Sequence, residues 1–187
     1  QSLLGTQKPG DLKYKDLNDD GIIDQYDITY IGKAKVPQVY YGFSLGAEYK
    51  KIDLNVFFEG ISGSTTYNSG YTYWDFYNSI GNVLEHHLDR WTPGSGQTAG
   101  YPRLTLSNNN NYVTSSYWVK DNSFLRLKYI ELGYTLPQSL SQKAGMSKFR
   151  IFVNGNYLYT WDKIKIKDPD GPDDAMDYPL RRTFSVG

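Results

Sequence analysis

Apolar and polar side chains alternate along residues 41–49, which is the pattern of a β-strand with two chemically different faces. After a turn at Lys50 and Lys51, residues 52–58 alternate in the same way. The two segments therefore predict a β-hairpin over residues 38–60. Its apolar face could pack on a soluble core, or it could face lipid while the polar face lines a wet interior. Alternation alone does not choose between these two settings.

Further strands are predicted within residues 123–187. Residues 124–136 predict a third strand, in which the alternation changes phase near Lys128 and so indicates a β-bulge. Residues 149–159 predict a fourth strand, and a fifth begins at Arg182. The segment between the third and fourth strands is a short turn that could hold one helical turn.

The connections between these strands alternate between long and short. We expect long polar loops over residues 1–37, 61–122 and 161–179, with a short helix over residues 82–91. Outer-membrane barrels show this asymmetry, because their periplasmic turns are short and their extracellular loops are long. The sequence thus predicts an all-β fold, a segment of an antiparallel transmembrane β-barrel whose long loops are extracellular.

Residues 16–27 have the spacing of an EF-hand-type calcium loop. Such a loop takes side-chain oxygens from positions 1, 3, 5, 9 and 12, a backbone carbonyl from position 7 and a glycine at position 6. These positions hold the side chains of Asp16, Asn18, Asp20, Asp24 and Asp27, the carbonyl of Ile22 and Gly21. Asp27 stands where glutamate is more usual. We expect bound calcium, the alternative being an acidic turn that Asn, Asp and Gly favour for backbone reasons.

Composition narrows the class of protein. The 187 residues carry 20 basic and 20 acidic side chains, so long-range charge gives no reason to expect a nucleic-acid partner. No cysteine is present, and 16% of the residues are aromatic, an excess that suggests a sugar-binding face or a membrane interface. The sequence has no run of about 18 apolar residues, so it predicts no transmembrane helix. The first residues lack the features of a signal peptide, so we expect a mature chain or a piece of a longer one.

Candidate contacts for a solute come from the strands and from the second long loop. Alternation places polar side chains on one face of the strands: Asp53, Asn55, Glu59, Arg150, Asn154 and Asn156. The bulge leaves the side of Arg126 and Lys128 open. Trp74, Tyr77 and Trp118 in the long loop could stack on sugar rings, or they could simply anchor the loop.

The sequence gives little support for an enzyme. His86 and His87 lie beside acidic residues, but adjacent residues of a helix point in different directions, which disfavours a metal site. Asp173 and Asp174 lie in a Pro- and Gly-rich loop with nothing to fix their separation. No Ser-His-Asp or Cys-His arrangement is evident, so we expect a protein that is not an enzyme.

Several motifs occur in the order in which one known family has them. The first is the segment from Gly10 to Asp24, which includes most of the calcium loop, and Tyr30-Ile-Gly32, Pro37 and Tyr41-Gly-Phe43 follow it. The later motifs are Tyr101-Pro-Arg103-Leu, Phe124-Leu-Arg126-Leu-Lys128, Leu132-Gly-Tyr134-Thr-Leu-Pro137, Asp168-Pro-Asp170, Tyr178-Pro179 and Arg182-Thr183. Over nearly its whole length the chain resembles the C-terminal part of the SusC/RagA-type TonB-dependent outer-membrane transporters.

The resemblance implies a bacterial outer-membrane barrel of about 22 strands with an N-terminal plug, of which this chain would supply about five C-terminal strands. Such a transporter would import oligosaccharides or peptides delivered by a SusD-type surface lipoprotein, with energy from TonB. The partners would be the remainder of the barrel, the plug, the lipoprotein, TonB and outer-membrane lipid. The chain contains neither the plug nor the TonB box, so we expect that it does not transport alone.

Two other kinds of protein share some of these features. A soluble, calcium-stabilised carbohydrate-binding β-sandwich would explain the alternation, the aromatic residues and the calcium loop, but not the alternating loop lengths. A dockerin-like module would need the calcium loop twice, with a helix after each copy, and one copy is present.

Overall fold

The structure, a computed structural model, describes residues 5–106, 110–171, 178 and 180–187. The chain divides into two compact units. The sheet unit comprises Lys33–Thr65, Asp121–Pro169 and Tyr178–Gly187, and the loop unit comprises Gln1–Gly32, Thr66–Lys120 and Asp170–Asp177. The division separates the predicted strands from most of the two long segments that were expected to be loops.

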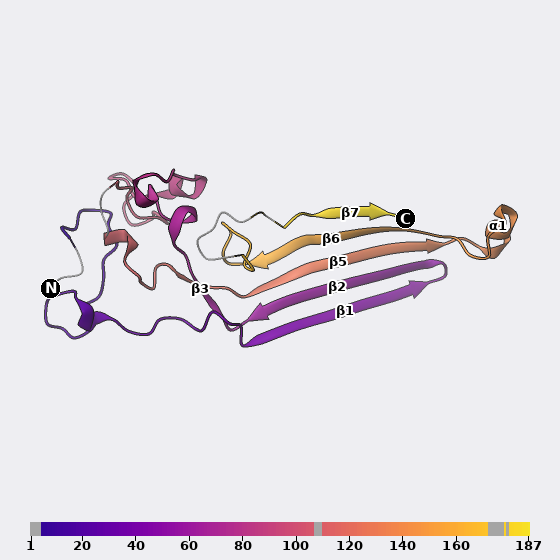
Figure 1. Cartoon of the computed structure of the whole chain (residues 1–187), viewed down its shortest axis with the longest axis horizontal. Coiled ribbons are helices and arrows are strands. Elements are labelled where there is room, and N and C mark those ends of the chain that lie inside the picture. Colours follow the sequence, from indigo (N-terminus) through magenta and orange to yellow (C-terminus); the bar gives the residue numbers. More distant parts are fainter. Residues whose placement is uncertain (1–4, 107–109, 172–177, 179) are drawn as a thin grey trace. The chain divides into compact units, whose positions relative to one another are not determined.

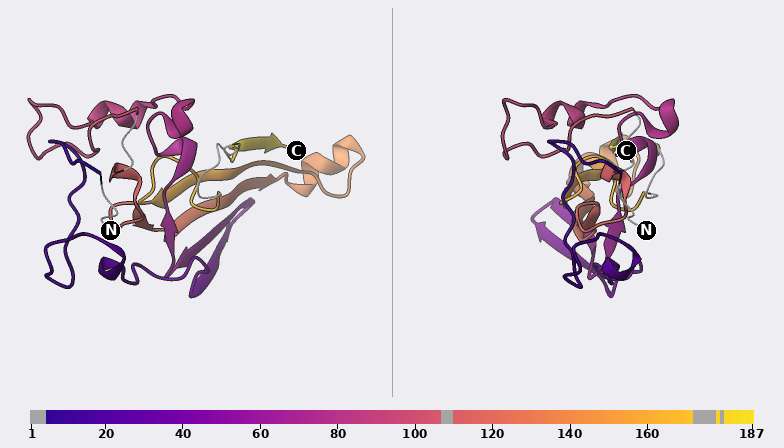
Figure 2. Two further views of the ribbon diagram at one scale, coloured as in Figure 1. Left: turned by 60° about the vertical axis from the view of Figure 1, so that its left-hand side comes forward. Right: turned by 90° about the vertical axis from the view of Figure 1, so that its left-hand side faces the viewer.

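Five antiparallel strands in the order β1-β2-β5-β6-β7 form the sheet (Figure 1). They are β1 Val39–Tyr49, β2 Ile52–Ser62, β5 Phe124–Thr135, β6 Arg150–Asp162 and β7 Thr183–Val186. The predicted hairpin and the three later strands are thereby confirmed. Figure 2 shows that the sheet is twisted, as expected from the intrinsic twist of each strand. The four longer strands have 11 to 13 residues, enough for a tilted transmembrane strand of about 9–11 residues.

Strand register gives the two faces of the sheet different chemistry. Leu45 lies opposite Val56, and Val56 lies opposite Ile130 on the next strand. The apolar face draws side chains from all five strands, among them Phe43, Leu54, Leu132, Val153, Trp161 and Phe184. The polar face includes Asp53, Asn55, Glu59, Glu131, Arg150 and Asn154. Alternation along each strand, combined with this register, gives the sheet one mainly apolar surface and one mainly polar surface.

The predicted bulge near Lys128 is confirmed. The register of β2 against β5 shifts between Phe57 and Phe58, and that of β5 against β6 shifts between Leu127 and Tyr129. A bulge places two consecutive side chains on nearly the same side of a strand. Lys128 and Tyr129 accordingly both reach carboxylates of the polar face.

In the described residues, helical structure is limited to segments of three to five residues. The loop unit holds the 3-10 helices η1 Gln25–Asp27, η2 Gly70–Thr72, η3 Tyr77–Ser79, η4 Glu85–Asp89 and η5 Asn110–Tyr112. The turn between β5 and β6 holds α1 Gln138–Ser141 and η6 Gln142–Ala144, as the sequence allowed. The helix expected over residues 82–91 is present as η4. None of the helices in the described part of the chain has the length and apolar character to span a bilayer.

An aromatic cluster forms the core of the loop unit. Tyr73, Tyr101 and Trp118 are buried and packed together, with Trp74 and Tyr117 among the side chains around them. The indole N–H of Trp118 donates to the carbonyl oxygen of Asn111 at 2.7 Å. A short two-stranded sheet, β3 Thr65–Tyr67 with β4 Val119–Asp121, brings the start and end of the long segment together. The segment read from sequence as irregular therefore has a packed core of its own.

Gly60 allows an aromatic side chain to cross the sheet. The Tyr41 hydroxyl on β1 donates to the Phe124 carbonyl on β5 at 2.8 Å, passing over Gly60 of the intervening strand. A Cβ at position 60 would lie 2.5 Å from the Tyr41 ring and 2.4 Å from that carbonyl oxygen. Glycine is therefore required by the close approach.

We expect Gly60→Ala to lower the free energy of unfolding by about 1–3 kcal/mol, because the added methyl group displaces Tyr41 or the β5 backbone. Thermal unfolding of the purified protein that carries this sequence measures the effect. Gly46→Ala is the matched control, since its Cβ would meet only the flexible Asn55 amide at 3.3 Å. Equal effects of the two substitutions would contradict the assigned role of Gly60.

Candidate functional site

Charged side chains from three strands meet on the polar face. The Arg150 guanidinium on β6 donates to Asp53 on β2 at 2.5 and 3.1 Å and to Glu131 on β5 at 2.7 Å. The Tyr129 hydroxyl donates to the same Glu131 carboxylate at 2.5 Å. The structure thus brings together the predicted Asp53 and Arg150. Tyr129 and Glu131 were not predicted as members of this group.

A second charged group lies toward the other end of the strands. Lys128 pairs with Glu59 at 2.6 Å, and Arg126 lies 3.7 Å from the other oxygen of Glu59. Arg126 also contacts the carboxylate of Asp168, in the segment that follows β6. The side that sequence left open for Arg126 and Lys128 is therefore the polar face. Asp168 was not predicted, because it lies in a loop and the alternation of side chains along strands gives no information about loop residues.

Amide side chains lie between the two charged groups. Asn55, Glu131 and Asn154 stand side by side on consecutive strands. Asn156 lies opposite Tyr129 and donates to the Thr183 hydroxyl on β7 at 3.3 Å. The polar face therefore presents hydrogen-bonding groups and charges that compensate one another. Such a surface suits contact with water and polar solutes better than contact with a highly charged solute.

The opposite face is apolar and open. Leu45 is 59% exposed and Val186 is 74% exposed, so the described residues leave much of this face uncovered. Tyr49 and Tyr134 lie near the hairpin turn, while Trp161 lies near the other end of the strands. Aromatic side chains at both ends of an exposed apolar band are typical of a barrel wall that crosses a membrane.

The segment predicted to bind calcium is an exposed loop ordered by its own side chains. Asp16 accepts the amides of Asp19 and Gly21 at 2.7 and 2.6 Å. Asn18 and Asp20 accept the amides of residues two positions further along, at 3.0 and 2.8 Å. The predicted ligand side chains are thus turned into the loop, although the acidic and histidine side chains of the described residues form no cluster of three that could hold a metal.

Asp24 and Asp27 close this loop. Asp24 caps η1 by accepting the Tyr26 amide at 2.9 Å, while Asp27 accepts the amides of Asp24 at 2.9 Å and Leu17 at 2.6 Å. Hydrogen bonds from the Asp24 and Leu17 amides lower the pKa of the Asp27 carboxyl group. Asp27 therefore stays ionised over a wider pH range than a free aspartate.

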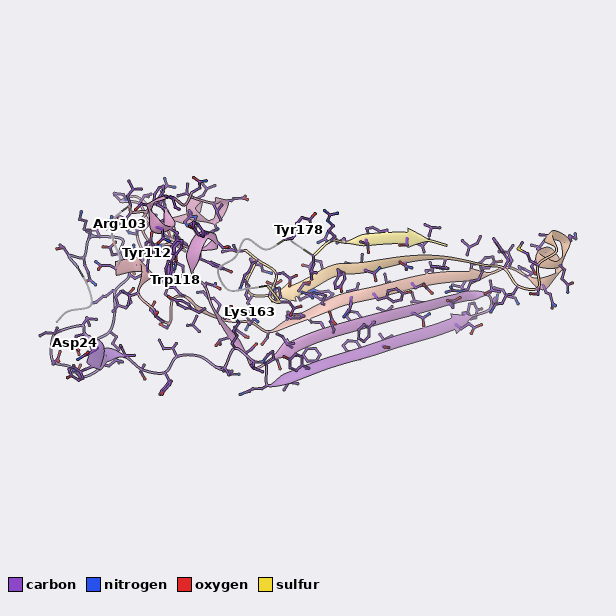
Figure 3. All side chains as sticks on the ribbon, in the orientation of Figure 1. Asp24, Arg103, Tyr112, Trp118, Lys163 and Tyr178 are labelled. Carbon is purple, nitrogen blue, oxygen red and sulfur yellow. The ribbon has the colours of Figure 1, made fainter. Side chains whose placement is uncertain are left out.

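The predicted aromatic contacts of the long loop differ in exposure. Trp74 stacks on Tyr112 with ring centroids 5.0 Å apart, and Tyr77 lies 5.5 Å from Trp74. Trp118 is only 2% exposed and belongs to the core of the loop unit (Figure 3). As placed, Trp118 anchors the loop and offers no open ring face, whereas Trp74 and Tyr77 are half-buried.

The two adjacent histidines lie against the same aromatic core. Their ring centroids are 4.0 Å apart, and the His87 ring meets Tyr101 at 4.6 Å, so the expectation that they point apart is wrong for this short 3-10 turn. Burial lowers the pKa of His86 to about 4 and also lowers that of His87. Both rings are therefore neutral near pH 7. Asp173 and Asp174, the carboxylate pair considered from sequence, lie outside the described residues.

Known proteins similar to this chain are transporters and receptors. A TonB-dependent receptor of Formosa agariphila is 30% identical over 198 aligned residues, which cover 99% of this chain and 20% of the relative. TonB-dependent receptor SusC of Bacteroides thetaiotaomicron is 30% identical over 184 residues, covering 96% of this chain and 17% of SusC. No family model matches the chain.

Solved structures give the same result. The RagAB peptide transporter matches 87% of this chain and 18% of its own chain, with a TM-score of 0.67 and 28% identity. The RagAB peptide importer in the 'open-open' state matches 84% of this chain and 17% of its own, with a TM-score of 0.61 and 26% identity. The chain is a segment of the SusC/RagA type of TonB-dependent transporter. Its sheet is accordingly a segment of an antiparallel transmembrane β-barrel.

This SusC/RagA-type segment spans about one-fifth of the curated relatives it matches, since it covers 20% of the first and 17% of SusC. The resemblance seen in the sequence motifs is thereby confirmed. The names of the relatives describe receptors and importers, which agrees with the expectation of a protein that is not an enzyme.

Proposed function

We propose that this chain forms part of the wall of an outer-membrane nutrient importer, with its apolar face against lipid and its polar face toward the lumen. The observation that carries the proposal is the separation of the sheet into an exposed apolar face and a charge-paired polar face. Fully burying one Leu, Val or Phe side chain is worth about 1.5–3 kcal/mol, so the uncovered face favours contact with a hydrocarbon phase.

The edges of the sheet support assembly with further strands. In the sheet that the structure describes, β1 and β7 are the two outer strands and each pairs on one side. Unpaired edges and lipid-exposed backbone groups are costly, and closure of a barrel satisfies them. The proposed partners are therefore the remainder of the barrel and its plug, with TonB acting on the complete transporter and a SusD-type lipoprotein on its outer side.

The cargo of the proposed importer is an oligosaccharide or a peptide. Amide and paired charged side chains on the polar face can hydrogen-bond either kind of molecule. The RagAB structures, which this segment resembles, are of a peptide importer, and that relation favours peptides. Trp74 and Tyr77 remain proposed contacts for a sugar ring. The chain carries no proposed catalytic step.

A soluble carbohydrate-binding β-sandwich is the alternative. In such a fold a second sheet covers the apolar face of the first. Within the described residues, the second sheet consists only of β3 and β4, with three residues in each strand, and Leu45 and Val153 stay exposed. The uncovered face therefore favours the transporter over the sandwich.

Cysteines at neighbouring positions of β2 test which face meets lipid. In the complete transporter, Leu54→Cys should react with a lipid-soluble maleimide, and Asn55→Cys with a water-soluble one, because the two side chains point to opposite faces. Labelling yields measured by mass spectrometry in native membranes give the result. Failure of Leu54→Cys to react with either reagent, with Asn55→Cys still labelled by the water-soluble one, would favour the sandwich, because a second sheet would cover Leu54. The reverse labelling pattern would move the lumen to the other face.

We further propose that the loop of residues 16–27 binds calcium. All its proposed ligands are oxygen atoms, which suits a hard divalent cation. Asp16, Asn18 and Asp20 are already turned into the loop by backbone amides, and carboxylate oxygens retain lone pairs for an ion beside those hydrogen bonds. Calcium binding would offset the mutual repulsion of the carboxylates and stabilise the loop.

Chelation of calcium should increase tryptic cleavage after Lys15 and Lys33, which flank the loop. Loss of the ion would allow the loop to unfold locally, and trypsin cleaves unfolded backbone more readily. Asp20→Ala should show the same increase in the presence of calcium, because it removes the ligand oxygen at that position. Asp19→Asn is the control for loss of a carboxylate, since Asp19 lies in the loop but at no ligand position. Cleavage that is unchanged both by the chelator and by Asp20→Ala would exclude the calcium site.

A further inference from the structure

Arg126 is a buried charge on an otherwise solvated surface. Its side chain is 2% exposed, although it projects from β5 onto the polar face. A guanidinium group stays ionised at any ordinary pH, so a buried one requires partners that compensate both its charge and its hydrogen-bond donors. Arg126 therefore has a role other than making this face hydrophilic.

The main partner of Arg126 comes from outside the strands. Its Nη2 donates to both carboxylate oxygens of Asp168, at 2.8 and 3.0 Å. Its Nε donates to the Thr160 hydroxyl on β6 at 3.0 Å, which fixes the plane of the guanidinium group. Asp168 lies six residues beyond the end of β6 at Asp162, so the contact brings the following segment back over the sheet.

Aromatic rings hold the guanidinium group in place. It lies 4.6 Å from the centroid of the Phe124 ring and 5.9 Å from that of Tyr157. Tyr157 has a φ of 54°, a left-handed conformation that a residue with a side chain rarely adopts. This irregular point of β6 lies where the register against β5 shifts, and it turns the tyrosine ring toward Arg126. The bulge thus helps to build the arginine site.

The segment from Asp162 to Asp168 is fixed at both ends. At its start, the Asp162 side chain accepts the amides of Ile164 and Lys165 at 2.8 and 3.0 Å. At its end, Asp168 binds Arg126. Between them, Ile164 is only 4% exposed, so the segment is packed and not merely tethered.

We propose that Arg126 is a positioning residue that holds residues 163–168 as a loop folded over the polar face, and that this loop narrows the lumen and limits the size of solute that passes. The part that concerns the lumen rests on the proposed function. Asp168 can reach Arg126 only on the polar side of the sheet, since that is the side to which Arg126 projects. The loop therefore lies over the path assigned to the solute.

The same segment offers a contrasting ion pair. Lys163 binds Asp121 at 2.8 Å, but these side chains are 70% and 41% exposed. Exposed pairs contribute little to stability, whereas loss of one partner of a buried pair leaves an uncompensated charge. Lys163→Ala is therefore a matched control for a change at Arg126 or Asp168.

The first arm of the test measures the position of the loop in the complete transporter. A cysteine at Ile164 should react slowly with a water-soluble maleimide. Arg126→Leu and Asp168→Ala should each raise that rate by about tenfold or more, because either change removes the buried pair. Lys163→Ala should leave the rate unchanged. The exchanged pair Arg126→Glu with Asp168→Arg should restore slow reaction. An unchanged rate in Asp168→Ala, which leaves the barrel strand intact, would overturn the positioning role even where Arg126→Leu fails to fold.

The second arm measures which sizes of reagent can pass the loop. Maleimides of graded size are reacted with Asn55→Cys, because Asn55 lies closer to the hairpin turn than Arg126 does and so beyond the loop. A small reagent should react in every variant, while a large polyethylene glycol maleimide added from outside should react only when Arg126 or Asp168 is changed. Failure of the small reagent would contradict the proposed lumen face. Success of the small reagent, with the large one reacting equally in all variants, would overturn the proposed narrowing alone.

Discussion

Backbone pairing between antiparallel strands is the constraint on which the rest of this structure depends. Because successive side chains point to opposite faces, register across β1, β2, β5, β6 and β7 determines which side chains become neighbours. A slip of one residue in β2 would place Asp53 where Leu54 now lies, between Ala47 and Leu132. The pairing therefore creates the apolar and polar faces together, and the transporter wall is a consequence of register more than of any single contact.

The departures from regular pairing occur where the polar face holds its charges. The bulge in β5 turns Lys128 toward Glu59, and the irregular point at Tyr157 supplies a ring beside Arg126. The three basic side chains Arg126, Lys128 and Arg150 each have a carboxylate partner from another strand or from the following segment. Such pairing keeps this part of the wall polar without a strong net field.

Local patterns predicted most of the sheet, because alternation and turn residues are properties of short segments. The hairpin, the bulge near Lys128 and the family resemblance could all be read from the sequence. Contacts between distant residues could not: Arg150 with Asp53, or Arg126 with Asp168, depends on register and on a loop path that periodicity does not contain. The burial of Trp118 was missed for the same reason, since a loop rich in Gly, Ser and Asn gives no periodic signal of a core.

The central claim is that this chain is one part of a larger membrane barrel. The most direct test is to extract outer membranes with detergent and determine the size and composition of the native species that contains this sequence. The account predicts that peptides from the sheet unit and the loop unit migrate together in a detergent-bound barrel several times larger than 21.4 kDa, accompanied by a surface lipoprotein. A monodisperse protein of 21.4 kDa that needs no detergent would contradict it.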